Sequence, residues 1–193
     1  MAGVCVYGIK TAASENGLDI DLTNKTLQLI PPDLPSNITK LILSHNLIQM
    51  SVADVAALER YTELTELRLD SNNITALPGH IFGSLSKLRI LSVSHNSIGR
   101  VDPGAFTALG NLKKLDLSHN PLQSLPLGVF SSLSSLGSLS LQDSGLHSLE
   151  NDTFTDLVKR TLVQLGGNPW NCSCAFLHQI KYSGVEISKK FAS

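Results

Sequence analysis

Cysteine, aromatic side chains, net charge and long apolar runs are all scarce in this sequence. The 193 residues include three cysteines, one tryptophan, three tyrosines and six phenylalanines. Basic and acidic residues nearly balance to a formal net charge of −1, so the overall charge favours neither nucleic acid nor an anionic membrane as a partner. No apolar run approaches the roughly 18 residues of a membrane-spanning helix, and the first residues lack the features of a signal peptide. We therefore expect neither a transmembrane segment nor a signal peptide in this chain.

Sequence motifs of catalysis are missing as well. Serines are plentiful, but no Gly-x-Ser-x-Gly sequence is present and the carboxylates are scattered. The Gly166-Gly167 pair matches no phosphate-binding loop. The sequence therefore predicts a protein that is not an enzyme and needs no cofactor.

The chain does contain one eleven-residue pattern, Leu-x-x-Leu-x-Leu-x-x-Asn-x-Leu, which recurs at a nearly constant interval. Its best copies are LTELRLDSNNI, LRILSVSHNSI and LKKLDLSHNPL, and they follow one another at steps of 24 residues. Six copies are in register, and their asparagine position is held by Asn46, Asn72, Asn96, Asn120, Ser144 and Asn168. Six copies at a fixed period predict a protein built from stacked repeats.

Each copy of the pattern predicts one short strand, because Leu-x-Leu alternation gives a strand with one buried face. We expect neighbouring strands to pair in parallel. The predicted fold is an α/β repeat solenoid: a curved horseshoe with a parallel sheet of six or seven strands on the concave face and irregular or 3₁₀ structure on the convex face. One apolar residue per strand should be buried in a line formed by Leu41, Leu67, Leu91, Leu115, Leu139 and Val163.

Two further ladders support this register. The asparagine amide can donate and accept hydrogen bonds, so it should bond the loop backbone of its own and adjacent repeats, with Ser144 as a weaker member. A second ladder, 24 residues apart, consists of Phe82, Phe106, Phe130 and Phe154. In the first repeat Leu58 takes the phenylalanine position, and Tyr61 follows it. We interpret these aromatic residues as core.

The three cysteines cannot all be paired within the chain. Cys5 precedes the repeats, whereas Cys172 and Cys174 follow them. Six strand steps of about 4.8 Å separate the two ends by roughly 29 Å, and a disulfide tolerates a Cα separation of about 7 Å. A bond between Cys172 and Cys174 would be strained. We therefore expect three unpaired thiols, with partner cysteines lying beyond Ser193.

Several segments resemble a known family. LPGHIFGSL and LPLGVFSSL carry the phenylalanine repeat, LQLIPPDLPSNITKLILSHN looks like an N-terminal cap leading into a first repeat, and GNPWNCSC is similar to the opening of a cysteine-rich C-terminal cap. On these segments the chain resembles the extracellular leucine-rich-repeat family, in particular Toll-like receptor ectodomains and variable lymphocyte receptors. The resemblance covers about residues 18–180. It implies a non-enzymatic recognition module located outside the cell or on its surface.

The resemblance also implies an organisation of the chain. Residues 1–37 would form an N-terminal cap segment, residues 38–158 about five repeats of 24–26 residues, and residues 159–193 the last repeat with a truncated C-terminal cap. The chain departs from the family pattern at Leu22, where a cap cysteine is usual, and at Arg160, which takes a leucine position. These departures favour a truncated product or a fragment of a longer receptor. An incomplete cap also predicts that two chains could pair through the C-terminal end.

The strand positions that face away from the core differ from repeat to repeat, while the core positions do not. A variable face on a constant scaffold suits recognition of an extended partner. The candidate ligand-binding residues are Lys40, Ile42, Glu66, Arg68, Asp70, Arg89, Ser92, Lys113, Lys114, Asp116, Ser140 and Gln164. We expect a protein, microbial or glycan ligand on this face, with Arg68 and Arg89 as the strongest contacts. The alternatives are a merely solvated face, or an adhesion or matrix protein that organises other proteins.

Three histidines share one position, in Ser-His-Asn triplets. His95 and His119 fall on neighbouring predicted strands about 5 Å apart, which is conceivable for a metal-binding pair. The third triplet contains His45, and the remaining copies place Ser71, Asp143 and Gly167 at this position. We therefore expect no acidic ligand beside the pair and no metal. A pH-sensitive patch is favoured, because adjacent imidazoles repel once protonated.

Five N-glycosylation sequons favour an extracellular origin, although their number is also compatible with chance. They begin at Asn24, Asn37, Asn73, Asn151 and Asn171. A redox or zinc half-site at Cys172 and Cys174 is less favoured than a C-terminal cap.

Overall fold

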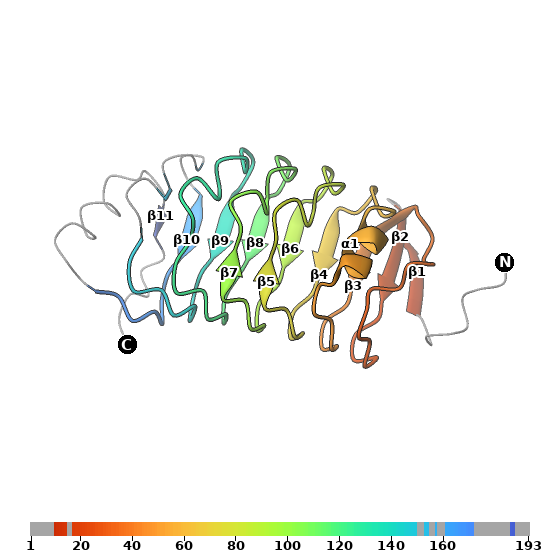
Figure 1. Cartoon of the computed structure of the whole chain (residues 1–193). Coiled ribbons are helices and arrows are strands. Elements are labelled where there is room, and N and C mark those ends of the chain that lie inside the picture. Colours follow the sequence, from red (N-terminus) through yellow and green to blue (C-terminus); the bar gives the residue numbers. More distant parts are fainter. Residues whose placement is uncertain are drawn as a thin grey trace.

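The computed structural model describes residues 10–14, 17–149, 153–154, 157, 161–171 and 186–187. Successive coils stack along one axis, and each coil adds one strand to a continuous sheet (Figure 1). This arrangement confirms the predicted parallel-strand solenoid. Five residues discussed above lie outside the described residues, namely Cys5, Asn151, Arg160, Cys172 and Cys174. The expectations about the cysteines, about the C-terminal cap and about pairing of two chains through that cap therefore concern a part of the chain that is not described.

Among the described residues, the main sheet has nine strands in the order β1-β2-β3-β4-β6-β8-β9-β10-β11. Their bounds are β1 Lys10–Ser14, β2 Gly17–Asp21, β3 Ile38–Ile42, β4 Glu66–Arg68, β6 Ile90–Ser92, β8 Lys114–Asp116, β9 Ser138–Ser140, β10 Leu162–Gln164 and β11 Glu186–Ile187. β1 pairs antiparallel with β2, and the other neighbours pair in parallel. The sheet is larger than the predicted six or seven strands, because the N-terminal segment contributes β1 and β2. We call the outward surface of this sheet the strand face.

The pairing register is the one that the repeat pattern predicts. Leu67 pairs with Leu41 and Leu91, and Leu115 pairs with Leu91 and Leu139. All six residues of the predicted buried line, from Leu41 to Val163, have no measurable exposure. At the N-terminal end, Leu22 is also fully buried in this core, at the position where the family resemblance implies a cysteine.

The side of the coils opposite the main sheet is mostly irregular, as predicted. It holds one short helix, α1 (Val52–Leu58), and a two-stranded parallel sheet of β5 (Ala76–Leu77) and β7 (Arg100–Val101) (Figure 1). The remainder consists of turns, and no 3₁₀ helix occurs among the described residues. The predicted irregular or 3₁₀ convex side is therefore realised as irregular structure in this part of the chain. The first repeat is longer than the others by two residues, and it is this repeat that accommodates the helix.

A buried carboxylate joins the helix to the N-terminal segment. Asp54 accepts hydrogen bonds from the backbone and the hydroxyl of Ser51, at 2.7 and 2.8 Å, which completes a capping box with the N-cap residue. Its other oxygen accepts from the backbone N–H of Ile30 at 2.6 Å. Asp54 therefore ties the entry segment to the first repeat.

The phenylalanine ladder forms the predicted second element of the core. The rings of Phe82, Phe106, Phe130 and Phe154 lie nearly parallel, with centroids 6.5, 6.3 and 6.4 Å apart. At the N-terminal end of the ladder, Tyr61 is fully buried. Its hydroxyl donates to the carbonyl of Pro31 and accepts from the N–H of Leu34. Tyr61 thus connects the first repeat to the N-terminal segment.

The asparagine ladder also forms as predicted. Asn72 donates through Nδ2 to the carbonyls of Leu43 and Leu69 at 2.9 and 3.0 Å, and its Oδ1 accepts from the N–H of Ile48 at 3.0 Å. Asn96 and Asn120 repeat this geometry one and two coils later. Each amide therefore bonds the backbone of its own coil and of the preceding one.

Candidate ligand-binding surface

The parallel register brings most of the predicted binding residues onto the strand face in two rows. One row runs through Lys40, Glu66, Ile90, Lys114 and Ser138, and the other through Ile42, Arg68, Ser92, Asp116, Ser140 and Gln164. Within each row, consecutive residues come from neighbouring strands about 5 Å apart. Asp70 follows the end of β4, whereas Arg89 and Lys113 immediately precede β6 and β8. The sequence thus places the candidates on one surface, but their individual environments differ.

The charges at the N-terminal end of the surface neutralise one another. Glu66 Oε1 lies 2.5 Å from Arg68 Nε, and Glu66 Oε2 lies 3.3 Å from Lys40 Nζ. The hydrogen bond with Glu66 raises the pKa of Arg68, with a further contribution from the negative charge of Asp70. The guanidinium is therefore already engaged, although its side chain is 45% exposed.

Asp70 is bound by three hydroxyl groups from the two neighbouring coils. Its carboxylate accepts hydrogen bonds from Ser44 Oγ and Ser94 Oγ, both at 3.0 Å, and from Ser92 Oγ. The serines of the Ser-His-Asn triplets, which the sequence analysis did not assign to the site, thus hold this carboxylate in place. The sequence did contain a signal for this contact, because Ser44, Asp70 and Ser94 occupy the same position of three consecutive repeats.

Two serines that were expected to be exposed on this face are buried. Ser92 and Ser140 are only 9% and 6% exposed. A serine side chain is short, and strands about 4.8 Å away on each side leave it little accessible surface. Ser92 is further drawn towards Asp70 by its hydrogen bond. The expectation of exposure is wrong for both positions.

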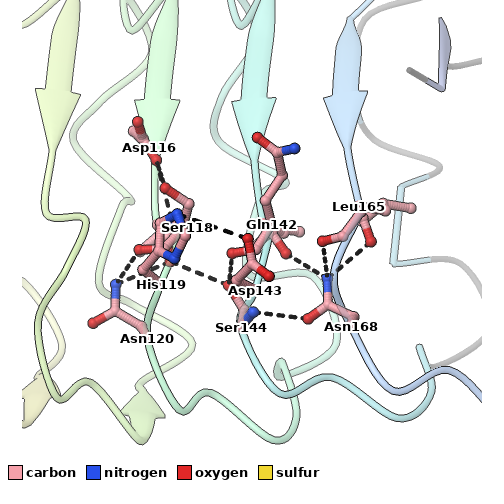
Figure 2. A network of polar contacts seen from close by, with 12 residues as sticks. Asp116, Ser118, His119, Asn120, Gln142, Asp143, Ser144, Leu165 and Asn168 are labelled. Carbon is pink, nitrogen blue, oxygen red and sulfur yellow. Dashed lines mark hydrogen bonds and ion pairs between the residues drawn. The ribbon is translucent and has the colours of Figure 1, made fainter. Parts of the chain in front are cut away.

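The other three residues of the row that runs from Ile42 to Gln164 are intermediate in exposure. Asp116 accepts hydrogen bonds from the backbone and hydroxyl of Ser118, at 3.0 and 2.6 Å, as Figure 2 shows. Ile42 and Gln164 are half-buried. Asp116 is therefore held by its own loop and is less available to a ligand than the sequence suggested.

Three cations stand apart from these networks. Arg89, Lys113 and Lys114 are exposed. Among the described residues, none of the three lies within 4.0 Å of a carboxylate oxygen. Arg89 and Lys113 border a hollow of about 260 Å³ beside the strand face. The positive charge of this surface is consequently concentrated at β6 and β8.

The position shared by the histidines forms a row just beyond the C-terminal ends of the strands. His95 and His119 stack with ring centroids 4.0 Å apart, and His119 Nε2 lies 3.7 Å from Asp143 Oδ2 (Figure 2). Asp143 follows β9, the neighbour of β8, so the expectation that no acidic group accompanies the pair is wrong. Within the described residues, no group of three or more His, Cys, Asp and Glu side chains is placed to hold a metal ion.

The described sequons are all accessible. Asn24, Asn37, Asn73 and Asn171 are exposed, and none of them lies within a strand of the main sheet. The described part of the chain contains no helix long and apolar enough to cross a membrane.

Comparison with known proteins gives one family and several relatives. A family profile described as "Leucine rich repeat" matches residues 62–122 and 110–169, which together make up more than half of the chain. Mouse leucine-rich repeat-containing protein 19 is 39% identical over 89 residues, human podocan-like protein 1 is 39% identical over 85, and the mouse platelet glycoprotein Ib alpha chain is 38% identical over 80. These matches cover 46%, 43% and 42% of this chain but only 24%, 16% and 10% of the relatives.

Proposed function

The chain belongs to the leucine-rich repeat family, and on that premise we propose that it is a recognition module that binds a protein partner through its strand face. Domains of this family generally act by binding proteins, and they carry their variable side chains on a constant scaffold. The observation that supports the strand face is its exposed, uncompensated positive charge at Arg89, Lys113 and Lys114. A partner that supplies negative charge would gain both affinity and rate of association there.

Within this proposal, the module is the ligand-binding part of an extracellular immune-type receptor for a protein, microbial or glycan ligand. The exposed sequons support an extracellular location, and one of the relatives is by name a glycoprotein. The second candidate is a cell-adhesion or matrix protein. A role of that kind could use the helix side of the coils or their ends instead of the strand face, so the location of the binding surface separates the two.

Alanine variants of the arginines test the strand face. A partner would first be isolated by selection from a displayed library of extracellular proteins. Arg89→Ala should then raise the Kd about tenfold, since 1.4 kcal/mol corresponds to tenfold and arginine is favoured at energetic centres of interfaces. Arg68→Ala should have a smaller effect, because Glu66 already engages its guanidinium. Titration calorimetry measures both.

The matched control is Arg60→Ala. Arg60 is exposed two residues after the end of α1, on the side opposite the strand face, and its replacement removes the same charge and side chain. If the Kd rises for Arg60→Ala and is unchanged for both strand-face variants, the partner binds elsewhere and the adhesion alternative is favoured.

Glycosylation is a separate prediction of the extracellular location. After expression through a eukaryotic secretory pathway, we expect a glycan at one or more of Asn24, Asn37 and Asn73, because each is exposed on a loop. Treatment with an N-glycosidase should then increase the electrophoretic mobility, and Asn→Gln variants should lose the corresponding bands. An unchanged mobility of secreted wild-type protein would argue against this part of the proposal.

A further inference from the structure

The hollow beside β6 and β8 is distinguished by the charge of its lining. It has a volume of about 260 Å³ and is lined by Thr65, Lys87, Arg89, Asn111, Lys113 and Ser135. Three of these six residues are cationic and none is acidic. The other three carry hydroxyl or amide groups. The hollow is thus polar and positive, on a chain whose net charge is −1.

The backbone fixes the position of the two central cations. The N–H of Arg89 donates to the carbonyl of Thr65, and the N–H of Lys113 donates to the carbonyl of Arg89, both at 2.8 Å. These bonds hold the two residues at the same position of consecutive coils, about 5 Å apart. The two side chains therefore start from neighbouring, fixed points at the edge of the sheet.

The neighbouring charges leave these cations available. Lys87, at the rim of the hollow, is bonded to both oxygens of Glu63, at 2.7 and 2.6 Å. By contrast, Arg89 and Lys113 have no carboxylate partner among the described residues. A carboxylate brought by a partner would meet an unneutralised guanidinium, which can bind it in a bidentate manner, with an ammonium beside it.

The short extent of the positive charge indicates what kind of anion fits. In the coils on either side, the position of Arg89 and Lys113 is taken by the neutral residues Thr65 and Gly137. The strand face next to the hollow also carries Asp116, whose charge would repel a long polyanion, and Glu66, whose charge is already paired with Lys40 and Arg68. The positive charge is therefore wide enough for one or two carboxylates but does not continue along the solenoid.

From these observations we propose that the hollow binds a glutamate or aspartate side chain from an acidic segment of the protein partner. This inference rests on the proposed strand-face function and assigns the chemistry of one contact within it. Arg89 makes the principal ion pair, Lys113 the second one, and Lys114 on the adjacent strand position attracts the acidic segment at longer range.

A labelled peptide provides the test. The probe is a fluorescent twelve-residue peptide with a central run of glutamates, compared with the same peptide carrying glutamines, and both are titrated to millimolar concentrations of the protein. We expect the glutamate peptide alone to raise the fluorescence anisotropy. Its affinity should fall about tenfold in the double variant Arg89→Gln/Lys113→Gln, and it should weaken as salt is added.

The control variant removes the same charge elsewhere. Lys25→Gln/Arg60→Gln lowers the net charge equally, at two exposed residues that do not line the hollow. It should bind the glutamate peptide as the wild type does. All four replaced side chains are exposed, so circular dichroism should show the same melting temperature for both double variants.

Three results would overturn the inference. They are an equal loss in the two double variants, an absence of binding by the glutamate peptide, and tighter binding of a sulfated oligosaccharide that depends on Arg89 and Lys113. The proposed function has a different signature. A selected partner that loses affinity with Arg68→Ala and Gln164→Ala but not with Arg89→Gln/Lys113→Gln would bind the strand face without using the hollow.

Discussion

Replacing Phe106 with alanine is expected to lower the free energy of unfolding by about 3–5 kcal/mol, the usual cost of truncating a large buried aromatic side chain. Phe106 has no measurable exposure and lies between the rings of Phe82 and Phe130, with centroids 6.5 and 6.3 Å away. Its removal leaves a cavity between two coils, and both neighbouring rings lose a stacking partner. In a solenoid the contacts between adjacent repeats supply much of the stability. Equilibrium unfolding in urea measures the change.

Two controls separate the loss of the ring from a general effect of mutation. Phe106→Leu keeps most of the apolar volume and should cost clearly less than the alanine variant. Leu127→Ala removes an apolar side chain that is 66% exposed, and its effect should be within about 0.5 kcal/mol of zero. If Phe106→Ala cost no more than Leu127→Ala, the phenylalanine ladder would not be part of the core.

The interior of the solenoid could be predicted because its positions are periodic. A leucine such as Leu91 or Leu115 recurs at a fixed step, and a strand pairs with its neighbour at the same step, so one pattern determines both burial and register. The asparagine ladder follows from the same period. Its bonds join groups whose relative positions the repeat already fixes. The comparison of coils within one sequence thus supplied the information that pairing requires.

The N-terminal segment could not be predicted in this way. β1 and β2 contain no copy of the leucine pattern, and they join the sheet because β2 extends the hydrogen bonding of β3. The pairing of β2 with β3 therefore depends on the edge of the existing sheet and not on a local sequence signal. The helix α1 did have a signal, since Ser51 precedes Asp54 by the three residues of a capping box.

The strand face was predicted as a set of positions but not as a set of available side chains. The sequence singled out Arg68 and Arg89 together as the strongest contacts, whereas in the structure one is bound by Glu66 and the other is not. Asp70 is likewise satisfied by three serine hydroxyls. Such differences depend on which rotamers meet across neighbouring strands. These contacts between side chains do not recur from repeat to repeat, so a comparison of the repeats does not reveal them.

The second large effect is expected in the asparagine ladder, where Asn96→Ala should cost about 1–3 kcal/mol of stability. The carbonyls of Leu69 and Val93, to which Asn96 Nδ2 donates, also accept from Asn72 and Asn120 and so keep a partner. The N–H of Ile74 is different, because it donates to Asn96 Oδ1 at 3.1 Å and loses this acceptor. The cost is that of one buried, unsatisfied amide, and urea denaturation would show it.

Ser144→Ala is the matched comparison, and we expect it to cost less than about 1 kcal/mol. The N–H of Leu122, which corresponds to that of Ile74 two coils earlier, donates to the backbone carbonyl of Ser144 at 2.9 Å and needs no side-chain acceptor. The Ser144 hydroxyl donates to the carbonyls of Leu117 and Gln142, and each of these also accepts another N–H, from Asn120 Nδ2 and from the backbone of His119. The alanine variant therefore leaves no backbone group unpaired. Equal losses in the two variants would mean that the side-chain acceptor at Asn96 is not what stabilises the ladder.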